Sequence, residues 1–133
     1  MKILLIDDSE ADVYLFQEAF RGLQSIHELE IARDGEGALQ HLHAAATRQD
    51  LPALILLDLN LPKLNGFEVL RAIRADSRLR LVPVIVVSSS SDVRQVRQAY
   101  ELGANAYMVK PLADFVDLVG DFERFWLQRA ELP

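Results

Sequence analysis

The sequence contains no cysteine, so disulfide bonds and cysteine-ligated metal sites are excluded and a reducing compartment fits. Its apolar runs fall far short of the roughly 20 residues that a membrane-spanning helix needs. The start Met-Lys leads directly into an apolar strand pattern, without the small-residue cleavage site of a signal peptide. Basic residues are the minority, with 14 Lys and Arg against 20 Asp and Glu, which argues against a nucleic-acid surface. These absences predict a soluble, cytoplasmic protein that binds neither membranes nor nucleic acids.

Strand-like and helix-like patterns alternate along the whole chain. Apolar runs predict strands at 2–7, 28–32, 54–57, 83–87 and 105–109. Amphipathic stretches predict helices at 10–21, 36–46, 66–75, 92–102 and 113–128, the first with Ser9 as its N-cap. With right-handed crossovers, this alternation predicts an α/β fold, a doubly wound five-stranded parallel sheet with five helices. Residues 1–133 show no linker, repeat or second domain, so we expect one domain and no separate output domain.

Acidic residues follow two of the predicted strands. Asp7 and Asp8 come after the apolar run 3–6, and Asp58 comes after the run 54–57. Because parallel strands end at the same edge of a sheet, where ligands bind in open α/β folds, the three carboxylates are expected to converge. Each like-charge pair at about 4 Å costs about 1 kcal/mol even at the dielectric constant of water. A cation would relieve this repulsion, and a ligand set made only of oxygen suits Mg²⁺ or Mn²⁺.

Ser88 and Lys110 follow the fourth and fifth predicted strands at the same edge. A carboxylate there can attack a phosphoryl group and form an acyl phosphate, a reaction that depends on positioning and charge neutralisation. Asp58 is the predicted nucleophile, because its strand lies between the acidic pair and Ser88. Lys110 would pair first with Asp58 and then with the phosphoryl group, and Ser88 would donate a hydrogen bond to it. The metal ligands would be Asp7, Asp8, Asp58 and the backbone carbonyl of Asn60.

Four segments resemble the receiver domain of two-component response regulators. They are the pair Asp7-Asp8 and the segments 56–66, 83–88 and 103–111. The resemblance implies a flavodoxin-like fold with strand order 2-1-3-4-5, Mg²⁺-dependent phosphorylation of Asp58 by a sensor histidine kinase, Ser88 as the switch hydroxyl and Tyr107 as the switch aromatic. The segments 8–12 and 16–20 are similar to single-domain regulators of bacterial phytochrome histidine kinases, which implies a bacteriophytochrome as the kinase.

The resemblance also implies a reversible switch. Phosphorylation would draw Ser88 toward the phosphoryl oxygens, and the Tyr107 ring would rotate into the vacated space. Asn60 and Ser90, each two residues beyond Asp58 and Ser88, would flank the attacking water and tune the lifetime of the acyl phosphate. The protein would then assist its own phosphorylation and dephosphorylation without being a conventional enzyme.

The last predicted helix carries more apolar residues than one core face needs. Trp126 continues its apolar stripe, whereas Phe125 and Leu127 fall off it. The rest of the stripe consists of Phe115, Leu118, Val119 and Phe122. These extra apolar residues predict a homodimer through the surface of the fourth helix, fifth strand and fifth helix. The alternative is that the whole stripe packs in the core of this small domain.

Two other classes of protein use the same or a related fold. An aspartate-nucleophile phosphohydrolase would use Asp58 in turnover, but it would need a second Asp where Asn60 stands. A flavin-binding electron carrier would need a phosphate-binding loop after the first strand, where Asp7 and Asp8 would repel a phosphate. A response regulator is therefore the preferred interpretation.

Overall fold

The computed structural model describes residues 1–22, 27–112 and 114–133. Within these residues, five parallel strands form one sheet in the order β2-β1-β3-β4-β5. The strands are β1 (Lys2–Ile6), β2 (Glu28–Ala32), β3 (Leu54–Leu57), β4 (Val84–Ser88) and β5 (Ala106–Val109). The predicted doubly wound sheet and its strand order are confirmed.

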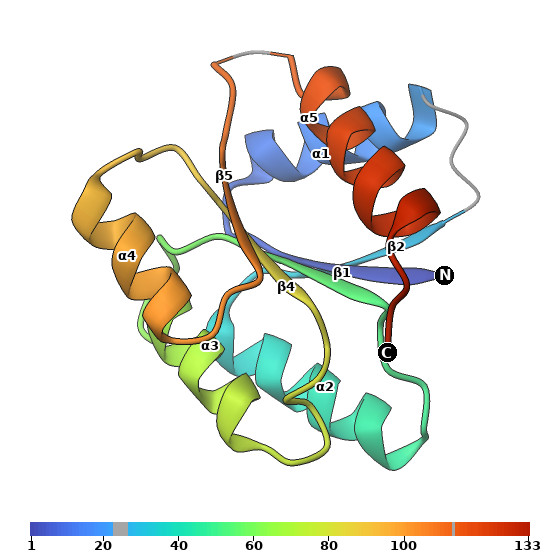
Figure 1. Cartoon of the computed structure of the whole chain (residues 1–133), viewed down its shortest axis with the longest axis vertical. Helices are drawn as coiled ribbons and strands as arrows, with labels where there is room; N and C mark the ends of the chain where they lie inside the picture. The colour runs from blue at the N-terminus through green and yellow to red at the C-terminus, as the bar shows by residue number, and fades with distance from the viewer. Residues whose placement is uncertain (23–26, 113) are drawn as a thin grey trace.

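Helices cover both faces of the sheet. In Figure 1, α1 and α5 lie on one face, and α2, α3 and α4 lie on the other. The helices are α1 (Glu10–Gly22), α2 (Gly35–Thr47), α3 (Gly66–Ala75), α4 (Val93–Glu101) and α5 (Val116–Phe122), and α5 continues into the π-helix η1 (Glu123–Arg129). None of the described helices is long and apolar enough to cross a membrane.

The unbroken apolar runs of the central strands follow from this two-sided cover. Alternate residues of a strand point to opposite faces, so each strand must be apolar on both. Ile3 and Leu5 pack in the core under α1 and α5, whereas Leu4 and Ile6 pack in the core under the other three helices. β3 divides its four buried residues in the same way.

The strand register brings the strand ends together. Ile6 of β1 pairs with Leu57 of β3, and the ladder continues one residue further, where the N–H of Asp58 donates to the carbonyl of Ile6 at 2.9 Å. The N–H of Asp7 donates likewise to the carbonyl of Ala32 at 3.0 Å. The acidic residues therefore stand side by side where the sheet ends.

Gly66 allows α3 to begin directly against the strand end that carries Asp58. A Cβ atom at Gly66 would lie 2.5 Å from the carbonyl oxygen of Asp58 and 2.5 Å from the Cα of Leu59. Asn65 and Glu68 close the start of the helix with a reciprocal capping box. The short connection after Asp58 is thus held in place by backbone packing.

The last helix departs from the sequence prediction. It begins at Val116, with Phe115 as N-cap, and the predicted start at Ala113 lies outside the described residues. From Glu123 it is a π-helix, in which side chains five residues apart share a face. Leu127 therefore follows Phe122 into the core and is only 7% exposed, so its predicted place off the apolar stripe is wrong.

The same register change keeps the other two apolar residues of η1 out of the fully buried core. Trp126 packs only partly against the core, and Phe125 is 57% exposed with its ring edge-on to Trp126. An uninterrupted α-helix would instead have placed Trp126 four residues after Phe122 on the buried face.

We expect Leu127→Ala to lower the free energy of unfolding by about 2–3 kcal/mol, because it leaves a cavity under η1. Phe125→Ala should cost about 1 kcal/mol or less, because most of that ring is in solvent. Urea denaturation at low protein concentration measures both values. A larger loss for Phe125→Ala would contradict the π-helical register.

Candidate functional site

Three carboxylates meet at the C-terminal edge of the sheet. Asp7, Asp8 and Asp58 each place an oxygen atom within 4.8 Å of the others. Asp7 is fully buried and Asp58 is 5% exposed, whereas Asp8 faces solvent. The cluster therefore has a buried floor and an open side. Its donors are all oxygen atoms, which fits a divalent cation that keeps several water ligands.

Backbone N–H groups orient the two buried carboxylates. The N–H of Ser9 donates to Asp7 Oδ1 at 3.0 Å, and the N–H of Asn60 donates to Asp58 Oδ1 at 3.3 Å. The second oxygen of each carboxylate faces Lys110. The side chain of Asn60 is exposed at the mouth of the site.

Lys110 contacts its predicted partner Asp58 and two further carboxylates. Its Nζ lies 2.8 Å from Asp7 Oδ2 and 2.8 Å from Asp12 Oδ2, but 3.5 Å from Asp58 Oδ2. The expected pair with Asp58 is thus the longest of three contacts. The lysine is nevertheless held inside the site, because its side chain is only 7% exposed.

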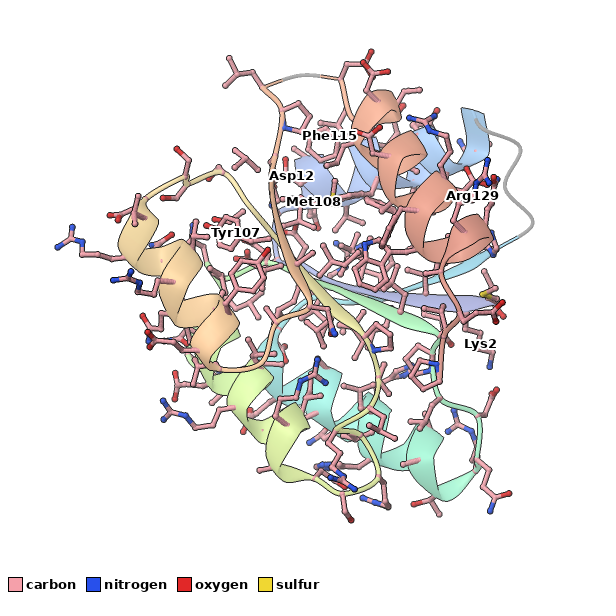
Figure 2. All side chains as sticks on the ribbon, viewed as in Figure 1. Lys2, Asp12, Tyr107, Met108, Phe115 and Arg129 are labelled. Carbon is pink, nitrogen blue, oxygen red and sulfur yellow. The ribbon has the colours of Figure 1, made fainter. Side chains whose placement is uncertain are left out.

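Asp12 is a site residue that the sequence analysis missed. It comes from the first turn of α1 and lies beside β5 in Figure 2. The one available signal was its place in the first turn of the helix that follows Asp7 and Asp8. Acidic residues are common in the first turn of helices, and that place does not by itself indicate a contact with Lys110.

Burial and charge shift the pKa values in the site. Burial raises the pKa of Asp58 to about 6, and the negative charge of Asp7 adds to this, although Lys110 and the Asn60 N–H oppose it. Burial alone would lower the pKa of Lys110, but its hydrogen bonds to Asp12 and Asp7, together with the negative charges of Asp58 and Asp7, outweigh burial and raise it. Lys110 therefore stays cationic, and protons compete with any cation for Asp58 near pH 6.

Ser88 lies deeper than predicted. It is the last residue of β4 and is fully buried, whereas the sequence placed it at the edge and not in the core. Its Oγ accepts a hydrogen bond from the N–H of Ser90 at 3.2 Å. The next residue along, Ser89, is exposed, so the chain leaves the interior immediately after Ser88.

Tyr107 connects this loop to β5. Its hydroxyl donates to the carbonyl of Ser90 at 2.6 Å, and its N–H donates to the hydroxyl of Tyr100 at 3.2 Å. The half-buried ring packs toward α4, on the opposite face of β5 from Met108 (Figure 2). The ring is therefore already half-buried and hydrogen-bonded to the loop that follows Ser88.

We expect Asp58→Asn to stabilise the cation-free protein at pH 7.5 by about 1–3 kcal/mol. The native state binds the Asp58 proton more tightly than the unfolded state does, because the pKa of an aspartate carboxyl in the unfolded state is about 3.8. The stabilisation from this proton is complete below that value and is lost as pH rises through about 6. The advantage of the variant should therefore be large at pH 7.5 and small at pH 4.

Urea denaturation in EDTA at the two pH values measures this difference. Glu101→Gln, an exposed carboxylate at the end of α4, is the matched control and should show no such pH-dependent gain. A variant no more stable than the parent at pH 7.5 would contradict the raised pKa of Asp58.

The chain is similar to known proteins over almost its whole length. Residues 3–120 match the family model described as the response regulator receiver domain. The response regulator Rcp1 of Synechocystis sp. is 42% identical, over 98% of this chain and 92% of Rcp1. The phosphorylated cyanobacterial phytochrome response regulator RcpA superposes with a TM-score of 0.92 at 39% identity, over 99% of this chain and 97% of that chain.

The Mn²⁺-bound form of Rcp1 superposes with a TM-score of 0.88 at 40% identity, over 99% of this chain and 98% of that chain. These similarities extend over the whole sheet and every strand end that builds the acidic site. The chain therefore belongs to the receiver domain family of response regulators, the phosphorylation-controlled modules of two-component signalling.

Proposed function

We propose that this protein is a single-domain response regulator, residues 1–133, which accepts a phosphoryl group on Asp58 from a sensor histidine kinase. The observation that carries the proposal is one carboxylate, Asp58, buried between two further carboxylates and a buried lysine. Asp7, Asp8, Asp58 and the backbone carbonyl of Asn60 would hold Mg²⁺ or Mn²⁺. The bound cation neutralises charge on the transferred phosphoryl group.

The chain's own residues perform the transfer. An oxygen of deprotonated Asp58 attacks phosphorus, and the bond between phosphorus and the kinase histidine breaks, leaving the electron pair on the imidazole. Lys110 offers its ammonium to one phosphoryl oxygen, and the Ser88 hydroxyl donates to another. Because Asp58 must be ionised, its raised pKa makes the reaction slow below about pH 6 unless a bound cation lowers that pKa.

The switch would run through the β4–α4 loop. By donating its O–H to the phosphoryl group, Ser88 would be drawn toward Asp58 together with the loop, because its Oγ accepts from the N–H of Ser90. Ser90 is also the residue whose carbonyl holds the Tyr107 hydroxyl. A shift of this loop therefore alters the contact between Tyr107 and α4, as a change of population between two packings.

The acyl phosphate would be lost by hydrolysis at the same site. Asn60 is exposed and Ser90 is half-buried at the mouth, so their side chains stand where water can reach Asp58. We propose that these two side chains adjust how long the phosphoryl group stays on Asp58. On this proposal the protein is not a conventional enzyme, because it assists only its own phosphorylation and dephosphorylation.

The proposed kinase is a bacteriophytochrome-type histidine kinase in the cytoplasm. Support comes from RcpA, a phytochrome response regulator that superposes over nearly the whole of both chains. The proposed partners include neither a nucleic acid nor a membrane. A phosphoryl donor must approach Asp58 from the open side of the cluster, where Asp8 and Asn60 are exposed.

A homodimer through α4, β5 and α5 is the second part of the proposal. Beside β5 lies a largely apolar groove of about 480 Å³, lined by residues that include Met108, Phe122, Phe125 and Trp126. Charge on the two flanking helices is complementary, because α4 exposes Arg94 and Arg97 while α5 exposes acidic residues. A two-fold axis along β5 would set the α4 of each copy against the α5 of the other.

The phosphoryl group should be carried by Asp58 and by no other acidic residue. We expect incubation with a small acyl phosphate and Mg²⁺ to add one phosphoryl group to the parent and to Glu101→Gln, but none to Asp58→Asn. Intact-protein mass spectrometry measures the added mass. Undiminished labelling of Asp58→Asn would refute the assignment, and steady release of phosphate from simple esters would favour a phosphohydrolase.

Dimerisation should respond to the phosphoryl group. With beryllofluoride and Mg²⁺, sedimentation velocity should show the parent shifting toward a dimer and Phe125→Ser remaining monomeric, because an apolar anchor is lost. Ser88→Ala should bind beryllofluoride but shift less than the parent. A parent that stays monomeric at high concentration, with and without beryllofluoride, would remove the dimer, and an equal shift in Ser88→Ala would refute the switch role of Ser88.

A further inference from the structure

Lys110 has a carboxylate partner that phosphoryl transfer, as described above, does not use. Asp12 accepts a hydrogen bond from Lys110 Nζ at 2.8 Å, the same distance as Asp7. Among the described residues, the carboxylates that converge within 4.8 Å are Asp7, Asp8 and Asp58, and Asp12 is outside this group. Asp12 is therefore placed to bind the lysine and not a cation.

The start of α1 fixes Asp12 in this position. The N–H of Asp12 donates to Ser9 Oγ at 3.2 Å, which caps the helix, and the N–H of Ser9 orients Asp7. A negative charge in the first turn is also favoured by the helix dipole. The same cap thus holds both carboxylates that bind Lys110.

Cation binding leaves these two carboxylates in different roles. Asp7 would turn its charge toward the cation, whereas Asp12 has no cation to bind and keeps its contact with Lys110. The ammonium has three N–H donors, and each one held by Asp12 is unavailable to the phosphoryl group. Phosphorylation also replaces one negative charge on Asp58 by almost two, which the charge of Asp12 opposes.

We propose that Asp12 is a positioning residue that retains the Lys110 ammonium away from Asp58 and thereby weakens the site's affinity for a phosphoryl group. The inference rests on the proposed function of Asp58. Loss of Asp12 would not leave Lys110 disordered, because the lysine is 7% exposed and packing confines its stem. The freed ammonium would move toward Asp58, which now lies 3.5 Å away.

The test measures two affinities in Asp12→Asn, which removes the charge and keeps the shape. With saturating Mg²⁺, fluorine NMR should show beryllofluoride binding about fivefold more tightly than to the parent, since a competing charge is gone. Calorimetry with Mg²⁺ alone should show binding about twofold weaker, because the site is less negative. A purely structural defect would weaken both affinities.

Glu10→Gln is the matched control, because Glu10 is an exposed carboxylate of the same helical turn. It should leave the beryllofluoride affinity at the parent value. Asp12→Ser provides a second variant should Asp12→Asn melt at a much lower temperature than the parent, and the same tightening is expected of it.

Unchanged or weaker beryllofluoride binding in the folded Asp12 variant, beside a parent that binds normally, would overturn the inference. An equal increase in the beryllofluoride affinity of Glu10→Gln would overturn it as well. The cause would then be the lower net negative charge of the protein and not the contact between Asp12 and Lys110. A parent that binds no beryllofluoride, or an Asp58→Asn variant that binds it equally well, would instead overturn the proposed function of the site.

Discussion

Repulsion between buried carboxylates is the constraint around which the rest of the molecule is arranged. Asp7 and Asp58 are both almost inaccessible to water, and burial raises the pKa of Asp58 to about 6. Lys110 offers a single positive charge, which it shares among three carboxylates. Such a site is poorly satisfied on its own, so it favours a divalent cation and, with that cation, an incoming phosphoryl group.

The sheet is what makes this arrangement possible. Its central strands are held by cores on both faces, so their ends cannot move apart to relieve the repulsion. Gly66 brings the start of α3 against the backbone of Asp58, which closes off a further direction of relaxation. The stability lost at the site is offset by packing elsewhere in the domain, as is common where function requires strained or unfavourable contacts.

A chain of hydrogen bonds joins the site to the α4 surface. It runs from Ser88 through Ser90 to Tyr107 and on to Tyr100 of α4. The turn that follows Tyr100 is anchored, because Arg74 donates to the carbonyl of Gly103 at 2.9 Å. A displacement that begins at Ser88 therefore reaches the C-terminal end of α4 at Tyr100, beside the anchored Gly103. This gives the receiver domain a physical route from Asp58 to its surface.

Periodicity and composition by themselves determined the βα alternation, the strand limits to within a residue, and the convergence of Asp7, Asp8 and Asp58, because parallel strands must end at one edge. Only the tertiary structure decided that Lys110 contacts Asp12 at the same distance as Asp7, since the contact with Asp12 joins residues 98 positions apart in the chain. It also decided that Leu127 and not Trp126 enters the core, because a π-helical turn changes which side chains share a face. Local pattern records the period of a regular helix or strand, whereas these contacts depend on how finished elements pack together.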